Sequence, residues 1–302
     1  MAVPVFIYDS FPARRFGGNV AGVVFLDSPA PRGWPQHIAA ELAAPTTGFV
    51  DMPTARMRDA RVRFFTPQQE IGACGHVTVA IATALAEAGV WPTGEAAVST
   101  AGGRYPVALS DCGTGRVRVE MRQRLRHLHQ PGQVPDPGQV PDMDGVLRPV
   151  QLSRRLPVTI AGTGLRHLLI PVQDAAGLAI LPMAAASIAE LSRALHVDTI
   201  GVFAVTSEDG ETVSVQMRDL CAGIGATEEP ASGTTSAALA FGLAQAGLLT
   251  GARARLRVDM GIEMGRPSRL SVDLDFADGR PAVARLWGFA DRVLTGEITA
   301  PA

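Results

Sequence analysis

The chain has 302 residues, of which 47% are hydrophobic and 19% charged, with a formal net charge of −2. This length allows two domains of roughly 150 residues, each able to bury a core, whereas the charge excludes the basic face that nucleic acid or an anionic membrane requires. The three cysteines are too scattered for a disulfide framework or a zinc cluster, and residues 1–9 lack a secretory pattern, so we expect a cytoplasmic protein.

The first half reads as short strands around one long helix. Apolar runs bounded by turn residues predict strands at 3–8, 19–26, 48–52, 61–65, 98–100, 105–109 and 117–121. A short helix is expected over residues 35–44, ended by Pro45, and an Ala-rich helix ends near Gly89. Residues 131–142 repeat Pro-Gly-Gln-Val-Pro-Asp, which no packed element tolerates, so 129–148 is predicted to be an insertion or linker.

The second half repeats this order. Strands are predicted at 168–171, 202–206, 213–217, 256–260, 270–276 and 282–286, with a helix over 183–195 and an Ala-rich helix ending near Gly247. We therefore predict an α+β protein whose two halves, 1–128 (joined by 288–302) and 149–287, are each a curved sheet wrapped around one helix. The site is expected between the halves.

A loop-to-helix stretch occurs twice, at a constant offset of 158 residues. Glu70 and Glu228 begin the two copies, Cys74-Gly75-His76 and Ser232-Gly233-Thr234 follow at matching places, and an alanine ladder ends each copy. Thr78 in one copy, and Ser232 or Thr234 in the other, are expected to accept hydrogen bonds from the first helix amides. Helix N-termini attract anions, so the two copies indicate two helix ends for one carboxylate. Close packing of small residues explains the alanine ladders equally well, but it does not explain the matching loop motifs.

Several motifs in register resemble the phenazine biosynthesis (PhzF-like) family. They span nearly the whole chain apart from the Pro-Gly insertion: Asp9-Ser10-Phe11, Gly18-Asn19, Phe65-Thr66-Pro67, Glu70, Cys74-Gly75-His76, Arg218, Glu228-Glu229-Pro230-Ala231-Ser232-Gly233-Thr234 and Met264-Gly265-Arg266-Pro267-Ser268.

The resemblance implies the diaminopimelate-epimerase-like fold, with two pseudo-symmetric halves, each a barrel-like, mostly antiparallel sheet around a central helix. It also implies proton-transfer chemistry without a cofactor or metal, on a small carboxylate, often in a homodimer. The type member isomerises a dihydro-hydroxyanthranilate, and other members are thought to isomerise alkylproline precursors of antibiotics.

Three positions depart from the family pattern. The usual acid/base glutamate is replaced by Thr46, whose hydroxyl is a poor base near neutral pH without a strong activator. The usual aspartate of the second copy is Glu229, and the usual loop serine is Thr234. These changes distinguish the chain from the type member at three positions of the family pattern.

We assign candidate roles on this basis. His76 is the leading proton carrier because imidazole exchanges protons near pH 7, Glu229 is the second acid/base candidate, and Thr46 stands in for the usual base. The predicted ligand-binding residues are Asn19, Cys74, Gly75, Ser232, Gly233 and Thr234. Glu70 and Glu228 are expected to be structural ties, with Arg218 as a partner of one of them or of the ligand.

Three functional hypotheses remain open. The first is a cofactor-independent isomerase that moves a proton and a double bond in a cyclic or amino-bearing carboxylate of a biosynthetic pathway, for example an antibiotic pathway. The second is a homologue that binds such a carboxylate without turnover, because it lacks the family glutamate. The third is an epimerase that uses Cys74, since a helix N-terminus favours the thiolate.

Overall fold

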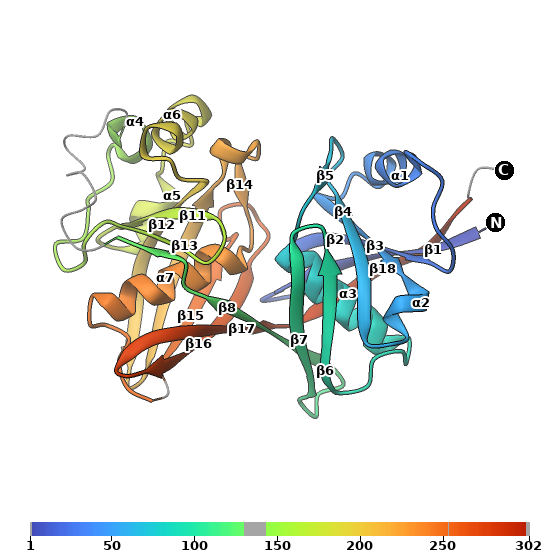
Figure 1. Cartoon of the computed structure of the whole chain (residues 1–302). Helices are drawn as coiled ribbons and strands as arrows, with labels where there is room; N and C mark the ends of the chain where they lie inside the picture. The colour runs from blue at the N-terminus through green and yellow to red at the C-terminus, as the bar shows by residue number, and fades with distance from the viewer. Residues whose placement is uncertain (1, 130–142, 253, 300–302) are drawn as a thin grey trace. The chain divides into compact units, whose positions relative to one another are not determined.

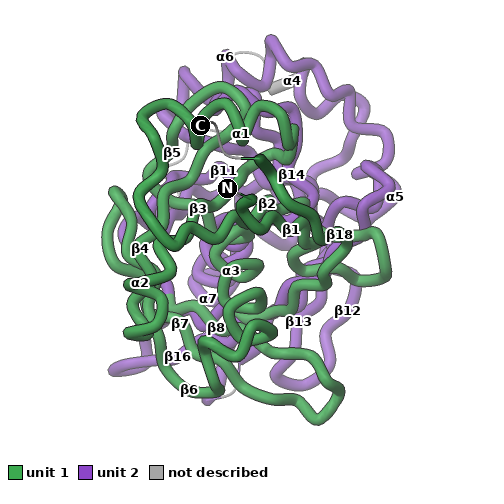
Figure 2. The backbone as a smooth tube through the Cα atoms, turned by 90° about the vertical axis from the view of Figure 1, so that its right-hand side faces the viewer, with its two compact units in different colours: residues 1–122, 287–302 green, residues 123–286 purple. Residues whose placement is uncertain are grey.

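A computed structural model describes residues 2–129, 143–252 and 254–299 (Figure 1). The chain divides into two compact units, Met1–Arg122 with Trp287–Ala302 (unit 1) and Gln123–Leu286 (unit 2), which are distinguished by colour in Figure 2. The last strand of the chain therefore belongs with the first, and β8 and β17 each cross a boundary between the units.

Unit 1 is built from nine strands, three helices and a shared end of β17. Its elements are β1 (Ala2–Ser10), β2 (Asn19–Leu26), α1 (Trp34–Leu42), β3 (Thr46–Asp51), α2 (Met52–Ala55), β4 (Asp59–Phe65), β5 (Glu70–Ile71), α3 (Gly75–Glu87), β6 (Gly94–Thr100), β7 (Gly103–Asp111), β8 (Val117–Arg124) and β18 (Ala290–Thr299). The strands pair in the order β18-β1-β2-β3-β4-β6-β7-β8, and the short β5 also pairs with β4. Only β2–β3 and β4–β6 are parallel among these pairs.

The helix α3 is the centre of unit 1. Every residue from Val77 to Leu85 is buried, and a helix that is apolar on all sides must be enclosed by other elements. It packs against β1, β2, β3 and β18. Gly48 on β3 allows this close approach, because a Cβ there would lie 2.6 Å from Ile81 and 2.9 Å from Val77.

Unit 2 has the same arrangement. Its elements are β9 (His127–Leu128), α4 (Met143–Leu147), β10 (Thr159–Gly162), β11 (Arg166–Pro171), α5 (Ala175–Ala179), α6 (Ala185–Leu195), β12 (Thr199–Asp209), β13 (Thr212–Leu220), the 3-10 turn η2 (Ala222–Ile224), β14 (Glu228–Glu229), α7 (Gly233–Gln245), β15 (Arg255–Met260), β16 (Ser268–Ala277) and β17 (Arg280–Gly288). The order β9-β10-β11-β12-β13-β15-β16, with β14 on β13, has its parallel pairs at β11–β12 and β13–β15.

This order matches unit 1 element by element, so the duplication seen around the two loops extends to the sheets. The helix α7 takes the place of α3: nearly all of its residues from Thr235 to Leu243 are buried, and it packs against β10, β11 and β16.

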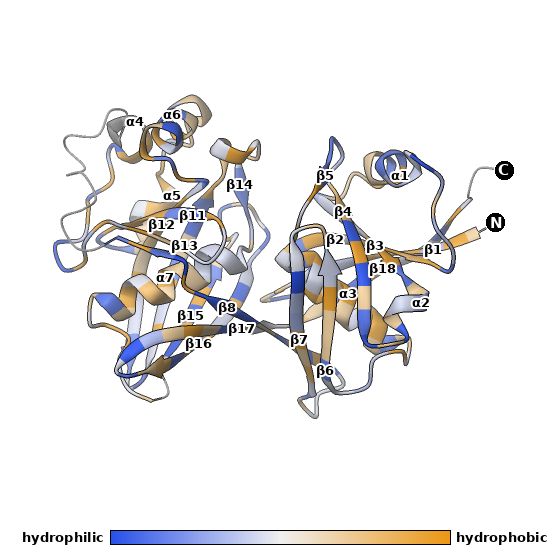
Figure 3. Cartoon of the chain, in the orientation of Figure 1, coloured by the Kyte–Doolittle hydropathy of each residue, from blue (hydrophilic) through white to orange (hydrophobic). Residues whose placement is uncertain are grey.

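The strands follow the alternation that the sequence predicts. In β4, hydrophilic and hydrophobic residues alternate along the strand (Figure 3), and the arginines face solvent while Val62 and Phe64 are buried. Such a period of two is expected where one face of a sheet covers a core.

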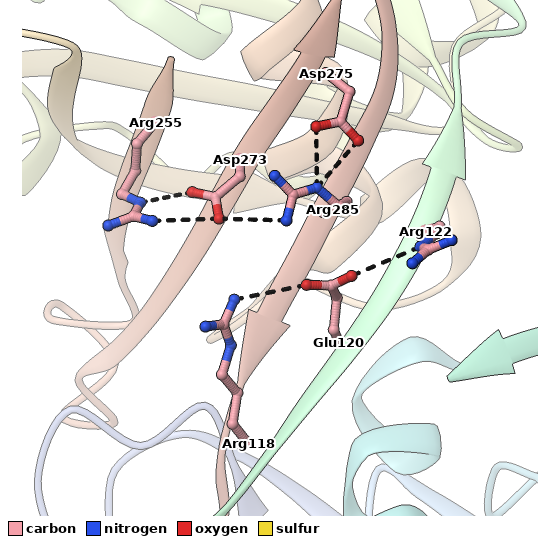
Figure 4. A network of polar contacts seen from close by, with 7 residues as sticks. All are labelled: Arg118, Glu120, Arg122, Arg255, Asp273, Asp275 and Arg285. Carbon is pink, nitrogen blue, oxygen red and sulfur yellow. Dashed lines mark hydrogen bonds and ion pairs between the residues drawn. The ribbon is translucent and has the colours of Figure 1, made fainter. Parts of the chain in front are cut away.

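Charged side chains on β8, β15, β16 and β17 form ion pairs within each unit (Figure 4). In unit 2, Arg255 pairs with Asp273, and Arg285 pairs with Asp273 and Asp275. In unit 1, Glu120 lies 3.6 Å from both Arg118 and Arg122. Most of these side chains are partly exposed, so each pair contributes at most about 1 kcal/mol of stability.

The predicted helices and strands are found with small shifts at their ends, and β2 has the predicted bounds. Of two predicted features of the helix ends, one is found and the other is wrong. Gly89 and Gly247 adopt positive φ just beyond α3 and α7, as expected of C-terminal glycines. Thr78 does not cap α3: its hydroxyl donates to the Cys74 carbonyl from within the first turn.

The predicted insertion at 129–148 falls mainly on residues 130–142, outside the described ranges. Its last residues form α4, whose Val146 and Leu147 are buried in the core of unit 2.

Candidate active site

In unit 1, the candidate residues gather where three strand ends meet the N-terminus of α3. Ser10 ends β1 and pairs with Asn19, which begins β2. Thr46, 5% exposed, begins β3 and pairs with Ala21. The Ser10 hydroxyl donates to the His76 carbonyl over 2.7 Å, which ties the first turn of α3 to the sheet.

The imidazole of His76 is held in one tautomer. Its Nδ1 lies 3.3 Å from the Asn19 amide nitrogen, which is only a donor, so Nδ1 accepts and the proton resides on Nε2. A hydrogen bond to the Val20 backbone also involves the ring. His76 is half-buried, and removal from water lowers the pKa of the imidazole to about 4, although the Val20 bond opposes this shift. At neutral pH His76 is therefore an uncharged base.

Cys74 lies beside this imidazole. It is the N-cap residue of α3 and makes no side-chain cap, and its Sγ is 3.4 Å from His76 Nδ1. The thiol and Asn19 thus converge on the same ring nitrogen.

In unit 2, Ser232 takes the place of Cys74. It is the N-cap of α7, and its Oγ accepts from the Thr235 amide over 3.4 Å. The Thr234 hydroxyl lies 3.4 Å from the same oxygen. A Cβ on Gly233 would clash with the end of the Leu286 side chain, which would have to shift, whereas a Cβ on Gly75 would meet only Met121 at 3.8 Å.

Glu229 is half-buried at the end of β14 and pairs with Asp219 on β13. Residues directly opposite on an antiparallel pair point to the same face of the sheet. The strands β13 and β14 therefore carry two carboxylates on one face. The matching pair of residues in unit 1, Phe64 and Ile71, is apolar.

An arginine fastens each loop to its sheet. Arg63 donates to both oxygens of Glu70 over 2.7 Å, and Arg218 donates to both oxygens of Glu228 over 2.9 and 2.7 Å. Arg218 also donates to the Leu178 carbonyl. The glutamates are thus structural ties, as predicted, and Arg218 is bound to one of them.

Sequence reasoning missed a group of four buried polar residues in unit 2: His167, Thr199, Asp219 and Thr235. Thr235 stands in the second signature, where Val77 holds the corresponding place in the first, and that contrast was a usable signal. The other three lie on different strands and carry no local motif.

Within the described ranges, no three His, Cys, Asp or Glu side chains gather closely enough to hold a metal ion. No helix of the described chain is long and apolar enough to cross a bilayer. The site residues named from the sequence remain predictions, grouped by the structure into one set in each unit.

The fold, in which each unit wraps a sheet around a buried helix, is found in other solved structures. A hydroxyproline epimerase from Agrobacterium vitis has this fold, with a TM-score of 0.58 at 13% identity over 98% of this chain and 92% of that one. A PhzF-family phenazine biosynthesis protein from Bacillus anthracis is closer in structure, with a TM-score of 0.83 at 22% identity over 99% of both chains. The predicted fold class is confirmed.

The profile of the phenazine biosynthesis-like (PhzC-PhzF) family matches residues 8–296, so the chain belongs to this family. A protein from Deinococcus radiodurans, described as an uncharacterized isomerase, is 36% identical over 235 residues, which is 77% of this chain and 73% of that protein. These relationships place the chain among the isomerases.

Proposed function

We propose that the chain is a cofactor-independent isomerase that moves a proton and a double bond in a small cyclic or amino-bearing carboxylate. The observation that supports it best is the neutral imidazole of His76, held in one tautomer at the first turn of α3. A base of this kind removes an acidic C–H proton without first losing its own.

The carboxylate would be bound at helix N-termini. Gly75 and Gly233 are the first residues of two helices of 13 residues, α3 and α7. Amides in the first turn lack intrahelical partners and lie at the positive end of the helix dipole. Asn19, Ser232 and Thr234 would contact the polar substituents of the substrate.

Proton exchange would use His76 and Glu229, with Thr46 in place of the usual glutamate. Thr46 is almost fully buried, so we assign it a role in shaping the site rather than in carrying a proton. We place the reaction in a biosynthetic pathway, for example one that supplies an antibiotic precursor such as a pyrroline carboxylate. We further propose a cytoplasmic homodimer.

The test is proton NMR in D2O with a panel of cyclic dienyl and pyrroline carboxylates. We expect deuterium to enter one carbon position of a panel member, at a rate reduced about 100-fold or more by His76→Ala and by Glu229→Gln. Two exposed residues of α1 provide matched controls, and His37→Ala and Glu41→Gln should leave the rate unchanged. Exchange that neither site variant impairs would contradict the assignment.

A second candidate is favoured by one contact. Because Cys74 Sγ lies 3.4 Å from His76 Nδ1, the thiol itself can be the group that meets the substrate, with the imidazole accepting its proton. The reaction would then be an epimerisation at one carbon. In the same assay, Cys74→Ser would abolish exchange. Iodoacetamide would inactivate the native protein, but not when a compound of the panel is bound.

Binding without exchange would instead support a non-catalytic homologue. In that case the native protein would broaden the NMR lines of a panel compound, and no deuterium would enter the compound.

A further inference from the structure

A chain of buried hydrogen bonds runs inward from Ser232 in unit 2. Ser232 Oγ lies 2.8 Å from Thr235 Oγ1, which donates to Asp219 Oδ2 over 2.7 Å. His167 Nδ1 lies 3.1 Å from Thr235 Oγ1 and 2.8 Å from Thr199 Oγ1. His167, Asp219 and Thr235 are each no more than 1% exposed.

The fold does not require these polar groups, as unit 1 shows. The parallel pair His167–Thr199 corresponds to Ala21–Thr46, and the pair Gly201–Asp219 corresponds to Gly48–Phe64. Thr235 corresponds to Val77 in the repeated stretch. An alanine, a phenylalanine and a valine thus fill the places that a histidine, an aspartate and a threonine occupy in unit 2.

Polar groups buried in this way are costly unless they are fully bonded, and these are not. Asp219 Oδ1 and His167 Nε2 are buried atoms without a hydrogen-bond partner in the described part of the chain. Because the apolar alternative is available in the same fold, the network calls for a functional explanation.

The directions of the hydrogen bonds follow from the donors available. The Thr235 hydroxyl donates its hydrogen to Asp219 Oδ2, so the lone pairs of Thr235 Oγ1 face Ser232 and His167. A neutral His167 ring has one N–H group. This group has an acceptor only if the hydrogen is on Nδ1, because that nitrogen alone lies near hydroxyl oxygens. Burial lowers the pKa of His167, so it stays neutral. The Ser232 hydrogen therefore points inward, to Thr235, and a lone pair of Ser232 faces outward.

We propose that Ser232, Thr235 and Asp219 form a proton relay that makes Ser232 an acid/base group of the isomerase in addition to His76 and Glu229. This inference rests on the proposed function. Ser232 is the catalytic residue that meets the substrate, and Thr235 and Asp219 are positioning residues that act through it. His167 and Thr199 hold Thr235 in place, and Glu229 faces Asp219 across the strands.

The step conserves atoms and charge. A proton leaves the substrate carbon for Ser232 Oγ while the Ser232 hydrogen moves to Thr235 Oγ1 and the Thr235 hydrogen moves to Asp219 Oδ2. The electron pair of the broken C–H bond stays in the conjugated system of the substrate, stabilised at its carboxylate end. Return of a proton along the relay to another carbon completes the shift and restores the Asp219 carboxylate.

The hydrogen-bond direction can be tested without a substrate, by Ser232→Cys. A thiol is tolerated at the matching N-cap, Cys74, so this variant is expected to fold. The probe is iodoacetamide, and the rate of alkylation at position 232 is followed against pH by peptide mass spectrometry. A helix N-terminus alone lowers the pKa of a thiol, whereas lone pairs and a carboxylate directed at it raise the pKa.

We expect the introduced thiol to titrate above the ordinary range for cysteine, and addition of Asp219→Asn to lower its pKa by about one unit or more. The amide of the new residue can donate to Thr235, which frees the threonine hydrogen for the thiolate. Glu263→Gln, which removes a carboxylate of unit 2 outside the network, should leave the pKa in place. A thiol pKa that does not respond to Asp219→Asn would overturn the relay.

A panel compound that undergoes exchange adds a kinetic test. Asp219→Asn and Thr235→Val should each lower kcat about 100-fold with KM little changed, and the double variant should be no slower than either single variant. Losses that multiply would show independent roles and contradict the relay. If no panel compound exchanges, the proposed function fails for that panel, but the thiol titration still decides the direction of the network.

Discussion

Folding removes the imidazole of His76 from water and places its ring nitrogens in contact with neighbouring groups. The ring nitrogens are shared with Asn19, Cys74 and the Val20 backbone, and protonation of Nδ1 would set two donors, the ring and the Asn19 amide, against each other. Burial lowers the pKa of the ring, whereas the Val20 hydrogen bond raises it and helps to orient the ring. The low pKa at this position is therefore a consequence of burial.

This lowered pKa predicts a pH-dependent stability. The pKa is about 4 in the folded protein and 6.5 in the unfolded chain, so the unfolded chain takes up the proton first as the pH falls. The stabilisation is complete above pH 6.5 and is lost as the pH falls through 4, by up to about 3 kcal/mol. Urea unfolding at pH 7 and pH 4.5 should show a smaller difference for His76→Asn than for the native protein. The exposed control His37→Asn should behave as the native protein does, and equal pH slopes for all three proteins would refute the shift.

At the scale of elements, the two loops are fastened by the same pair in different surroundings. The side chains of Arg218 and Glu228 are 6% and 5% exposed, whereas those of Arg63 and Glu70 are 56% and 40% exposed. Hydrogen bonding to Arg63 lowers the pKa of Glu70 even so. The duplication therefore offers a buried and an exposed version of one interaction within a single chain.

We expect Arg218→Met to cost about 3–5 kcal/mol, because it leaves a buried carboxylate and the Leu178 carbonyl without their donor. Arg63→Met should cost no more than about 1 kcal/mol, because water replaces the lost partner. Chemical denaturation of both variants gives the comparison. Similar losses at the two sites would mean that burial does not set the strength of the pair.

At the scale of the whole molecule, the chain closes unit 1 with its final strand. β18 pairs with β1 along their lengths, from Ser10 and Ala290 to Ala2 and Thr299. The Phe11 amide donates to the Phe289 carbonyl, and Gly288 lets the Phe11 ring approach the backbone. Unit 2, in contrast, is one continuous stretch of the chain.

This arrangement predicts that unit 1 can be made continuous. Ala2 and Thr299 face each other on antiparallel strands, about 5 Å apart, so a two-residue Asn-Gly hairpin should join residues 287–299 to residues 2–122. We expect this permuted unit to unfold cooperatively by circular dichroism. Residues 2–122 alone should not, because β1 would lose β18, one of its two partner strands. Cooperative unfolding of both pieces would show that β18 is dispensable.

The sequence alone was sufficient for the family, the fold class and most elements, because these depend on local patterns. Alternation with a period of two marks a half-buried strand wherever it pairs, and the repeated loops reveal the duplication. The same patterns placed Cys74 and Ser232 at matching helix starts, where the structure has them. Thr78 was misjudged because a hydroxyl one turn into a helix can bond backward to a carbonyl instead of capping an amide.

Only the tertiary structure decided which distant residues meet. His167 faces Thr199 because β11 and β12 are parallel neighbours, and Asp219 reaches Thr235 because α7 begins over the end of β13. Alternation shows which side of a strand is buried, but not which strand lies next to it or at what register. The orientation of the His76 ring likewise depends on Asn19 and Val20, more than 50 residues away in the sequence. Periodicity in a sequence therefore specifies elements, whereas pairing across the sheet determines the chemistry of the side chains that the pairing brings together.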